Sequence, residues 1–328
     1  MKKKTILSAL ATLTSALLLA SCTNVNYRVT FSDNWNTDTT DSTPRITETL
    51  KYNVSFKKSS GADAVNYKLN YSNGTYTATL SPIALQDGTT GYQYETSLTI
   101  DATFTLGETS ETKTDVMTST VIFKNSGSSL QPISSLKTMT CHSPTNLENA
   151  GKLEDCYLAY NYKIETSYES NLSKGKTVIT NLAAMENNVS TREFDIEDDK
   201  YTYLDNEQLL LALRGVSPSL NSAPVFLVYA PFTAAVQSIK ATFNTTTSAT
   251  SFTFNKNGQA YTGDISYREV NVSIDSKTPG ATQTLWIADK ATDPQSNQNR
   301  NIILKMETPI SYNLGTLTYE LTEETVSL

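Results

Sequence analysis

The stretch Tyr92–Leu106, YQYETSLTIDATFTL, decides the fold class. All but one of its even-numbered positions carry apolar side chains, namely Tyr92, Tyr94, Leu98, Ile100, Ala102, Phe104 and Leu106. The positions between them are polar, which is the period of a β-strand with one buried face. Ordinary strands have about five or six residues, whereas these roughly 15 residues would reach nearly 50 Å at ~3.3 Å each. We therefore expect a strand that bends or belongs to a tall, curved sheet.

Similar alternation extends outward from this stretch in both directions. Residues 50–56 alternate, and residues 64–80 hold an Asn73-Gly74 pair, which predicts a hairpin turn between two strands. Asn257-Gly258 and Pro279-Gly280 predict further turns. We expect other strands at 114–124, 133–141, 156–167, 175–181, 190–196, 224–230, 235–244, 249–255, 262–275, 281–288, 300–307 and 315–323. About fifteen strands joined by polar turns are typical of an antiparallel meander.

One helix is expected, in the segment YLDNEQLLLALRG at 203–215. Asp205 suits the N-cap position, with Gln208 three residues later, and Gly215 suits the position after the end. Residues 209–213 are apolar on all sides, which predicts a short buried helix near 205–214. One short helix covers little of a sheet that is apolar on one face, so the sheet has to roll up or enclose a guest. The predicted fold class is all-β, with a large antiparallel curved sheet or half-barrel.

The composition agrees with an all-β chain. Roughly 50 threonines and the 18 tyrosines suit a pleated, half-buried surface. The net charge of −7 falls to about −10 if the first 21 residues are removed, because they contain three lysines and no acid. A domain this acidic lacks the basic stripe that phosphate binding needs, so we expect no nucleic-acid partner.

The N-terminal 22 residues read as an export signal. Three lysines at 2–4 precede an apolar stretch at 6–20, which is shorter than the ~20 residues that span a bilayer. The stretch ends in LASC, with the cysteine at Cys22. This ending resembles the lipobox of bacterial lipoprotein precursors, in which the cysteine thiol receives a diacylglyceryl group and a peptidase cuts before it.

The lipobox resemblance implies a domain organisation and a location. Residues 1–21 would be a signal peptide, and Cys22 a lipidated N-terminus whose two acyl chains anchor stably. We expect 22–43 to form a flexible tether and 44–328 a single β domain, with a sub-boundary near 126–132 as an alternative. The domain would be held outside the cytoplasm at a cell membrane, and inner, outer and Gram-positive membranes are all compatible with the sequence.

Cys141 and Cys156 remain after lipidation. Both stand at apolar positions at the ends of two predicted strands that flank a polar loop. A disulfide across this hairpin and two buried free thiols both fit the pattern.

No catalytic, metal or cofactor motif is evident. His142, the single histidine, lies in a stretch expected to be a solvated polar loop, and the acidic run at 195–199 lacks the spacing of a dedicated Ca²⁺ site. A pair of carboxylates for hydrolysis is compatible with the sequence, but nothing in the pattern singles out one pair among the 33 acidic residues. Arg214 is expected to anchor the helix to a strand, or else to clamp a ligand carboxylate, and Trp286 is expected in the core or at a rim.

The segment YLDNEQLLLALRG and the following TQTLWIAD, NIILKMET and GTLTYEL, together 201–323, resemble a bacterial domain family of unknown function that exported proteins and lipoproteins carry. In that family a D-N-E-x-L helix precedes strands with a T-x-x-W run, and here Gln283 stands three residues before Trp286. The resemblance implies a curled antiparallel sheet, somewhat like the half-barrels of lipoprotein carriers, and brings no activity.

The sequence supports three functional hypotheses in order. The first is a non-enzymatic, lipid-anchored envelope protein that binds a small apolar or amphipathic molecule, or a protein partner. The second is a structural or adhesive surface module with a filled core, and the third is an envelope hydrolase. A carrier predicts an internal cavity of several hundred Å³, whereas a structural module predicts a tightly filled interior.

Overall fold

A computed structural model describes residues 28, 29, 31, 47–125, 129–145, 148–186, 188–196, 200–217, 223–276, 281–289 and 301–327. The predicted signal peptide, Cys22 and most of the predicted tether lie outside the described residues. The same holds for 197–199 in the acidic run and for the predicted Pro279-Gly280 turn.

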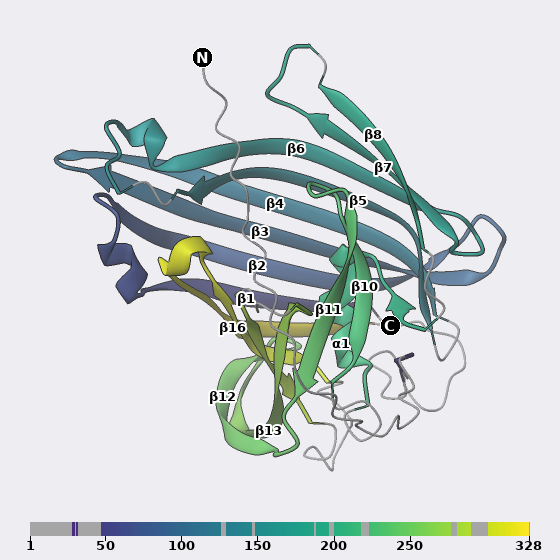
Figure 1. Ribbon diagram of the computed structural model, residues 1–328. Helices are drawn as coiled ribbons and strands as arrows, with labels where there is room; N and C mark the ends of the chain where they lie inside the picture. Colours follow the sequence, from purple (N-terminus) through teal and green to yellow (C-terminus); the bar gives the residue numbers. More distant parts are fainter. Residues whose placement is uncertain are drawn as a thin grey trace, which may run out of the picture.

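The described strands form one 16-stranded sheet (Figure 1). Its first half is a meander in which each strand pairs antiparallel with the next. Its members are β1 (Thr47–Lys58), β2 (Lys68–Ala84), β3 (Thr90–Leu106), β4 (Thr109–Asn125), β5 (Leu130–Pro144), β6 (Tyr157–Tyr168), β7 (Lys174–Asn181) and β8 (Val189–Asp195). Short 3-10 turns, η1 (Ser60–Asp63) and η2 (Leu153–Asp155), follow β1 and precede β6. The long strand expected at Tyr92–Leu106 is confirmed as β3, which has 17 residues.

The second half of the sheet closes on itself. Its strands are β9 (Thr202–Tyr203), β10 (Val225–Ala230), β11 (Ala235–Phe243), β12 (Ser248–Lys256), β13 (Gln259–Ile274), β14 (Gln283–Ala288), β15 (Ile303–Pro309) and β16 (Gly315–Ser327), with the 3-10 turn η5 (Ser311–Asn313) before β16. Because β12 pairs with both β13 and β16, strands β12 to β16 form a closed five-stranded barrel. The meander extends from this barrel through β1, which pairs with β16, while β11, β10 and β9 extend from β13.

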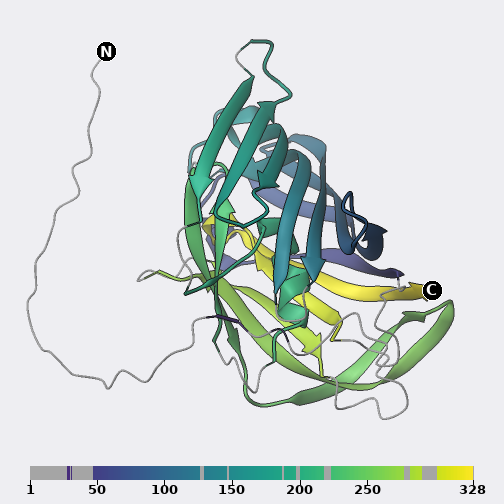
Figure 2. The same cartoon turned by 90° about the vertical axis from the view of Figure 1, so that its right-hand side faces the viewer.

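The predicted fold class is confirmed. The sheet curves strongly, and one short helix, α1 (Leu209–Arg214), lies inside it (Figure 2). The 3-10 turn η3 (Asn206–Gln208) precedes α1, and Asp205 and Gln208 make the expected capping box. No helix in the described part of the chain is both long and apolar enough to cross a membrane.

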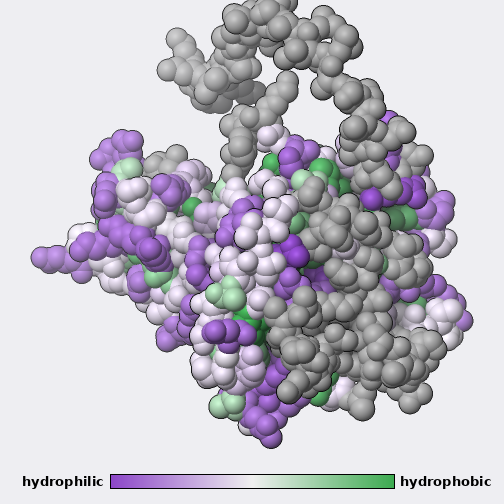
Figure 3. All heavy atoms as spheres, turned by 90° about the horizontal axis from the view of Figure 1, so that it is seen from below, coloured by the Kyte–Doolittle hydropathy of each residue, from purple (hydrophilic) through white to green (hydrophobic). Residues whose placement is uncertain are grey.

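The interior is filled mainly by the sheet's own side chains. One continuous apolar cluster joins the meander, α1 and the barrel, and its largest fully buried members include Phe104, Phe123, Phe226, Leu211, Leu213 and Leu285. On the barrel side of the molecule, the described residues show hydrophobic side chains only as small separate patches (Figure 3). A sheet with one apolar face was expected either to roll up or to enclose a guest. Here rolling up buries most of the apolar face.

The prediction of a hairpin at Asn73-Gly74 is wrong. Residues 68–84 form the single strand β2, and the pair lies at a β-bulge between Ser72 and Thr75. Asn73 takes a positive φ of 53°, as it would in a turn, but Gly74 stays paired with Val54 of β1. The pairing with β1 on one side and β3 on the other keeps the chain extended, and the bulge bends the long strand.

Threonine pairs explain the composition of the outer face. Neighbouring strands present hydroxyls opposite one another, as in Thr103 with Thr112 at 2.9 Å and Thr118 with Thr138 at 2.6 Å. Such cross-strand pairs stabilise a sheet modestly while leaving its solvent face polar.

Two residues inside the predicted tether lie against the body of the protein. Val29 and Phe31 lie within the range 22–43, yet both are buried, each with 5 % of its surface exposed. The backbone N–H of Val29 donates to Thr202 Oγ1 at 2.9 Å, and Phe31 forms a β-bridge with Val216. At the predicted sub-boundary near 126–132 the sheet is continuous, since Asn125 of β4 pairs with Leu130 of β5.

Candidate functional site

A hollow of about 300 Å³ lies on the inner face of β5 and β6, beneath the turn that joins β10 to β11. We refer to it as the inner hollow. Its apolar lining includes Met139, Ile164, Tyr229 and Phe232, and its charged lining is Lys137, Asp205 and Glu207. A hollow of this kind suits a guest that has an apolar body and one polar group.

Asp205 is the central polar residue of the inner hollow. Its Oδ2 accepts hydrogen bonds from the hydroxyls of Ser135 and Tyr168, both at 2.6 Å, and its Oδ1 accepts from the backbone N–H of Glu207 at 2.8 Å. Burial, followed by the nearby charge of Glu207, raises the pKa of this carboxyl. The N-cap of the helical segment is thereby tied to β5 and β6, so the same side chain caps the segment and shapes the hollow.

Lys137 and Glu207 form an ion pair at 2.9 Å beside Asp205. Burial disfavours both charges, but the mutual attraction outweighs it. The pKa of Glu207 therefore lies below its ordinary value and the pKa of Lys137 lies above it. Both groups are charged at neutral pH, and both retain some exposure to the hollow, 25 % for Lys137 and 16 % for Glu207.

An aromatic rim stands at the mouth of the inner hollow. Phe232, in the β10–β11 turn, is 50 % exposed, and its ring centroid is 5.3 Å from that of Tyr162 and 6.3 Å from that of Tyr160. The turn is held down by Arg192 of β8, whose Nη1 donates to the carbonyl of Pro231 at 2.7 Å. The rim leaves an aromatic face available to a guest.

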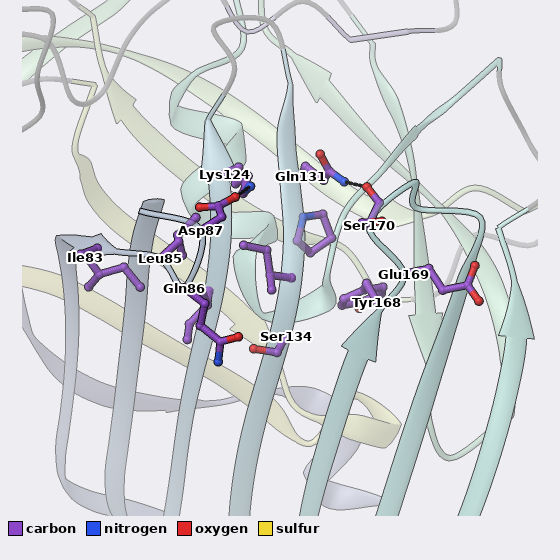
Figure 4. Close-up of a pocket in the computed structure, with 14 residues that line it drawn as sticks. Ile83, Leu85, Gln86, Asp87, Lys124, Gln131, Ser134, Tyr168, Glu169 and Ser170 are labelled. Atoms are coloured by element: carbon purple, nitrogen blue, oxygen red, sulfur yellow. Dashed lines mark hydrogen bonds and ion pairs between the residues drawn. The ribbon is translucent and has the colours of Figure 1, made fainter. Parts of the chain in front are cut away.

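A second hollow, of about 460 Å³, lies at the end of the sheet where the β2–β3 turn and the β6–β7 turn come together (Figure 4). We refer to it as the edge hollow. It has apolar walls such as Leu85 and Pro132, an exposed Lys124–Asp87 ion pair at 2.6 Å, and a 2.7 Å hydrogen bond from Gln131 Nε2 to the carbonyl of Ser170. Tyr168 lines both hollows, so they lie at the same end of the sheet.

Arg214 does not line either hollow. Its guanidinium binds both carboxylate oxygens of Glu48 on β1, at 2.8 and 3.0 Å, and donates from Nε to the carbonyl of Asn301 at 3.1 Å. Both charged side chains are 3 % exposed. The geometry is that of an anchor between the helix and a strand, one of the two roles expected for this residue.

Trp286 lies on β14 of the barrel, half-buried. Lys305 Nζ stands 4.6 Å above the centre of its ring, in a cation–π contact. The neighbouring Gln283 and Thr284 bond to Thr308 and Asn271. None of these residues lines the hollows, so the structure does not bring Trp286 together with Asp205 and Arg214.

Cys141 and Cys156 are both free, and of the two expected arrangements the structure shows the unbridged one. In the β5–β6 ladder, Cys141 pairs with Tyr160. Cys156 lies just before the start of β6, one position past the last pair of the ladder, Pro144 with Tyr157. Cys156 therefore stands four residues further along the ladder than Cys141, or ~13 Å, which is too far for a disulfide. Burial and Asp115 raise the pKa of Cys141 to about 12.

His142 is not the solvated loop residue that was expected. β5 continues to Pro144, and His142 Nδ1 lies 2.8 Å from Asp115 Oδ1, with 13 % and 10 % exposure of the two side chains. The backbone N–H of His142 donates to the same oxygen at 2.9 Å, and the ring packs edge-on against Tyr157. Among the described residues, no group of three His, Cys, Asp or Glu side chains could hold a metal.

Sequence reasoning identified Asp205 but missed the residues that line the inner hollow with it, namely Lys137, Tyr168, Glu207 and Phe232. One signal was present: Ser135, Lys137 and Met139 share a face of β5, so a lysine stands in an inward-facing row. Glu207 is two residues from Asp205, whereas Tyr168 and Phe232 come from segments further away in the chain, and only the tertiary structure brings them to the hollow.

The fold defines this chain as a β-barrel-like protein. No family model matches the sequence, and no curated protein matches it. Among solved structures, it is similar to the crystal structure of a β-barrel-like protein of the domain of unknown function DUF1849 from Brucella abortus. The two share 8 % sequence identity over 87 % of this chain and 99 % of the other, with a TM-score of 0.51. This likeness concerns the fold, which is compatible with a non-enzymatic ligand-binding module.

Proposed function

We propose that this protein is a lipid-anchored envelope protein that binds a small amphipathic molecule in the inner hollow without transforming it. The observation that carries the proposal is the combination of an aromatic rim with a charged floor in one hollow of about 300 Å³. An apolar chain would pack on Phe232 and Met139, while a polar head group would meet Lys137 and Glu207. The lipobox at 19–22 supports the anchor.

The arrangement of the polar groups favours binding over catalysis. Both oxygens of Asp205 already accept hydrogen bonds from Ser135, Tyr168 and a backbone N–H. Cys141, with a pKa raised to about 12, is protonated at neutral pH and is a poor nucleophile. Glu207 is charged but held by Lys137, so it is positioned to stabilise a guest.

A structural or adhesive module is the second candidate, and the filled core favours it. Most of the apolar face is occupied by the protein's own side chains, and both hollows are open to solvent rather than sealed. This candidate predicts that the hollows bind no apolar probe above the level of an unrelated surface.

A titration with the fluorescent fatty acid cis-parinaric acid separates the two candidates. The chain starting at Thr23 should bind the probe, and Phe232→Ala should weaken binding about fivefold, because it removes an aromatic contact of ~1 kcal/mol. Tyr312→Ala is the matched control, since Tyr312 is similarly exposed at 55 % but lies in η5, outside both hollows. Equal affinity of the two variants, or no binding by the parent chain, would reject the inner hollow as the site.

The anchor is tested separately. Cys22→Ala should move the protein from the membrane fraction to the soluble fraction, because the acyl chains supply the attachment. Cell fractionation followed by immunoblotting measures this shift. Membrane attachment that persists in the variant after a high-salt wash counts against the lipid anchor.

A further inference from the structure

The N-terminal segment is tied to the body of the protein close to the predicted lipid anchor. Val29 is held by Thr202 on β9, and Phe31 packs 6.4 Å, between ring centroids, from Phe226 on β10. Val29 is seven residues after Cys22. Even a fully extended chain of seven residues spans at most ~25 Å. The length of the chain therefore limits the distance between a lipid on Cys22 and Val29 to that value.

β9 adjoins the end of the sheet that carries both hollows. Thr202, which holds Val29, precedes Tyr203, whose hydroxyl donates to that of Tyr168 at 3.5 Å. Tyr168 lines both hollows, and Tyr203 and Tyr168 belong to one apolar cluster with Tyr229. Two hydrogen bonds, joined by the Thr202–Tyr203 peptide, thus connect the docked N-terminal segment to the hollows.

The opposite end of the sheet is far from this point. β3 and β4 each have 17 residues and meet in the turn at Gly107–Glu108, while the β2–β3 turn that lines the edge hollow stands at the other end of β3. A strand of 17 residues is roughly 55 Å long. The two ends of the meander therefore differ clearly in their distance from the anchor.

We propose that the protein is held with the Tyr168 end of its sheet against the bilayer that carries the anchor, so that both hollows face that membrane and take their guest from its phospholipids. This proposal rests on the lipid anchor proposed above. A freely swinging domain would present either end equally, whereas docking of Val29 and Phe31 removes most of that freedom.

The test uses two single labels on the lipidated protein. Ser170→Cys places an exposed thiol beside Tyr168, and Glu108→Cys places one at the far end. A thiol-reactive fluorophore at pH 7 selects these positions, because Cys141 and Cys156 are buried or half-buried and burial raises their pKa values. The labelled proteins are reconstituted into phosphatidylcholine vesicles that contain a nitroxide-headgroup phospholipid.

The label at residue 170 should be quenched at least threefold more than the label at residue 108. Inserting a 20-residue Gly-Ser linker between Thr23 and Asn24 leaves the docked segment intact but lengthens its reach, and should remove most of the difference. Thr202→Val removes the hydroxyl that accepts the hydrogen bond from the N–H of Val29, so it should also reduce the difference in quenching between the two labels. Equal quenching of the two labels, or stronger quenching at residue 108, overturns the proposal.

Flotation of the same vesicles separates this proposal from the anchor itself. If the protein floats with the vesicles and the two labels are equally quenched, the anchor holds and the orientation is wrong. If the protein does not float, the anchor has failed, and the orientation proposal falls with it.

Discussion

Arg214 shows how one buried residue ties distant parts of the chain together. It follows a run of leucines in α1, yet its charge is satisfied by Glu48 on β1 and by the backbone of Asn301 before β15. Asn301 returns the contact by donating from Nδ2 to the carbonyl of Arg214 at 3.0 Å. The sequence indicated that this arginine needs a carboxylate, but 166 residues separate it from the partner, and no local pattern identifies that partner.

Replacing Arg214 by methionine should destabilise the protein by about 3–5 kcal/mol, because it leaves the Glu48 carboxylate buried and unpaired. Arg268→Met is the matched control, since Arg268 pairs with Asp289 at 3.4 Å but is 28 % exposed, and it should cost no more than ~1 kcal/mol. Urea unfolding followed by circular dichroism measures both values. Adding Glu48→Met to Arg214→Met should recover most of the loss, and similar costs for the two arginine variants would contradict this account.

At the scale of the element, the same dipeptide has two outcomes in this chain. Asn257-Gly258 forms the expected β12–β13 turn, with φ of 49° and 80° and Lys256 paired to Gln259. Asn73-Gly74 becomes a bulge inside β2. The local sequences are alike, with alternating residues on both sides. The difference is that residues 68–84 pair with β3 along almost their whole length, and residues 74–80 pair with β1 on the other edge.

The two glycines should therefore respond differently to alanine. A Cβ at Gly74 would stand 2.6 Å from the carbonyl oxygen of Val54, so Gly74→Ala should cost about 2–3 kcal/mol by overpacking. A Cβ at Gly258 meets nothing within 4 Å, so Gly258→Ala should cost about 1 kcal/mol, from its positive φ alone. Gly151→Ala should be nearly neutral. Urea midpoints give the order, and a Gly258 variant less stable than the Gly74 variant would refute the bulge packing.

At the scale of the whole molecule, the meander and the barrel share one core. β1 pairs with β2 of the meander and with β16 of the barrel, and the hydroxyl of Tyr52 on β1 donates to the carbonyl of Ile303 on β15 at 2.8 Å. The helix α1 lies in the same apolar cluster. The described residues of the two halves share one apolar interior, so we expect the chain to unfold as one cooperative unit.

Two probes of unfolding test this expectation. In a Trp35→Phe background, the fluorescence of Trp286 reports on the barrel, whereas far-UV circular dichroism reports on the whole sheet. The two urea transitions should coincide, because loss of the barrel removes the partner of β1. Two separated midpoints would show that the meander and the barrel are independent domains.

The sequence by itself determined the all-β class, the tall strand at Tyr92–Leu106, the capped helix after Asp205 and the resemblance of the LASC stretch to a lipobox. These follow from period, capping and short motifs, which depend on neighbours a few residues away. Only the tertiary structure decided the closure of the barrel, the docking of Val29, the free state of Cys141 and Cys156, and the grouping of Lys137, Tyr168, Glu207 and Phe232 around one hollow. The physical reason is that alternation tells which side chains are buried, whereas strand register and sheet curvature determine which buried side chains meet.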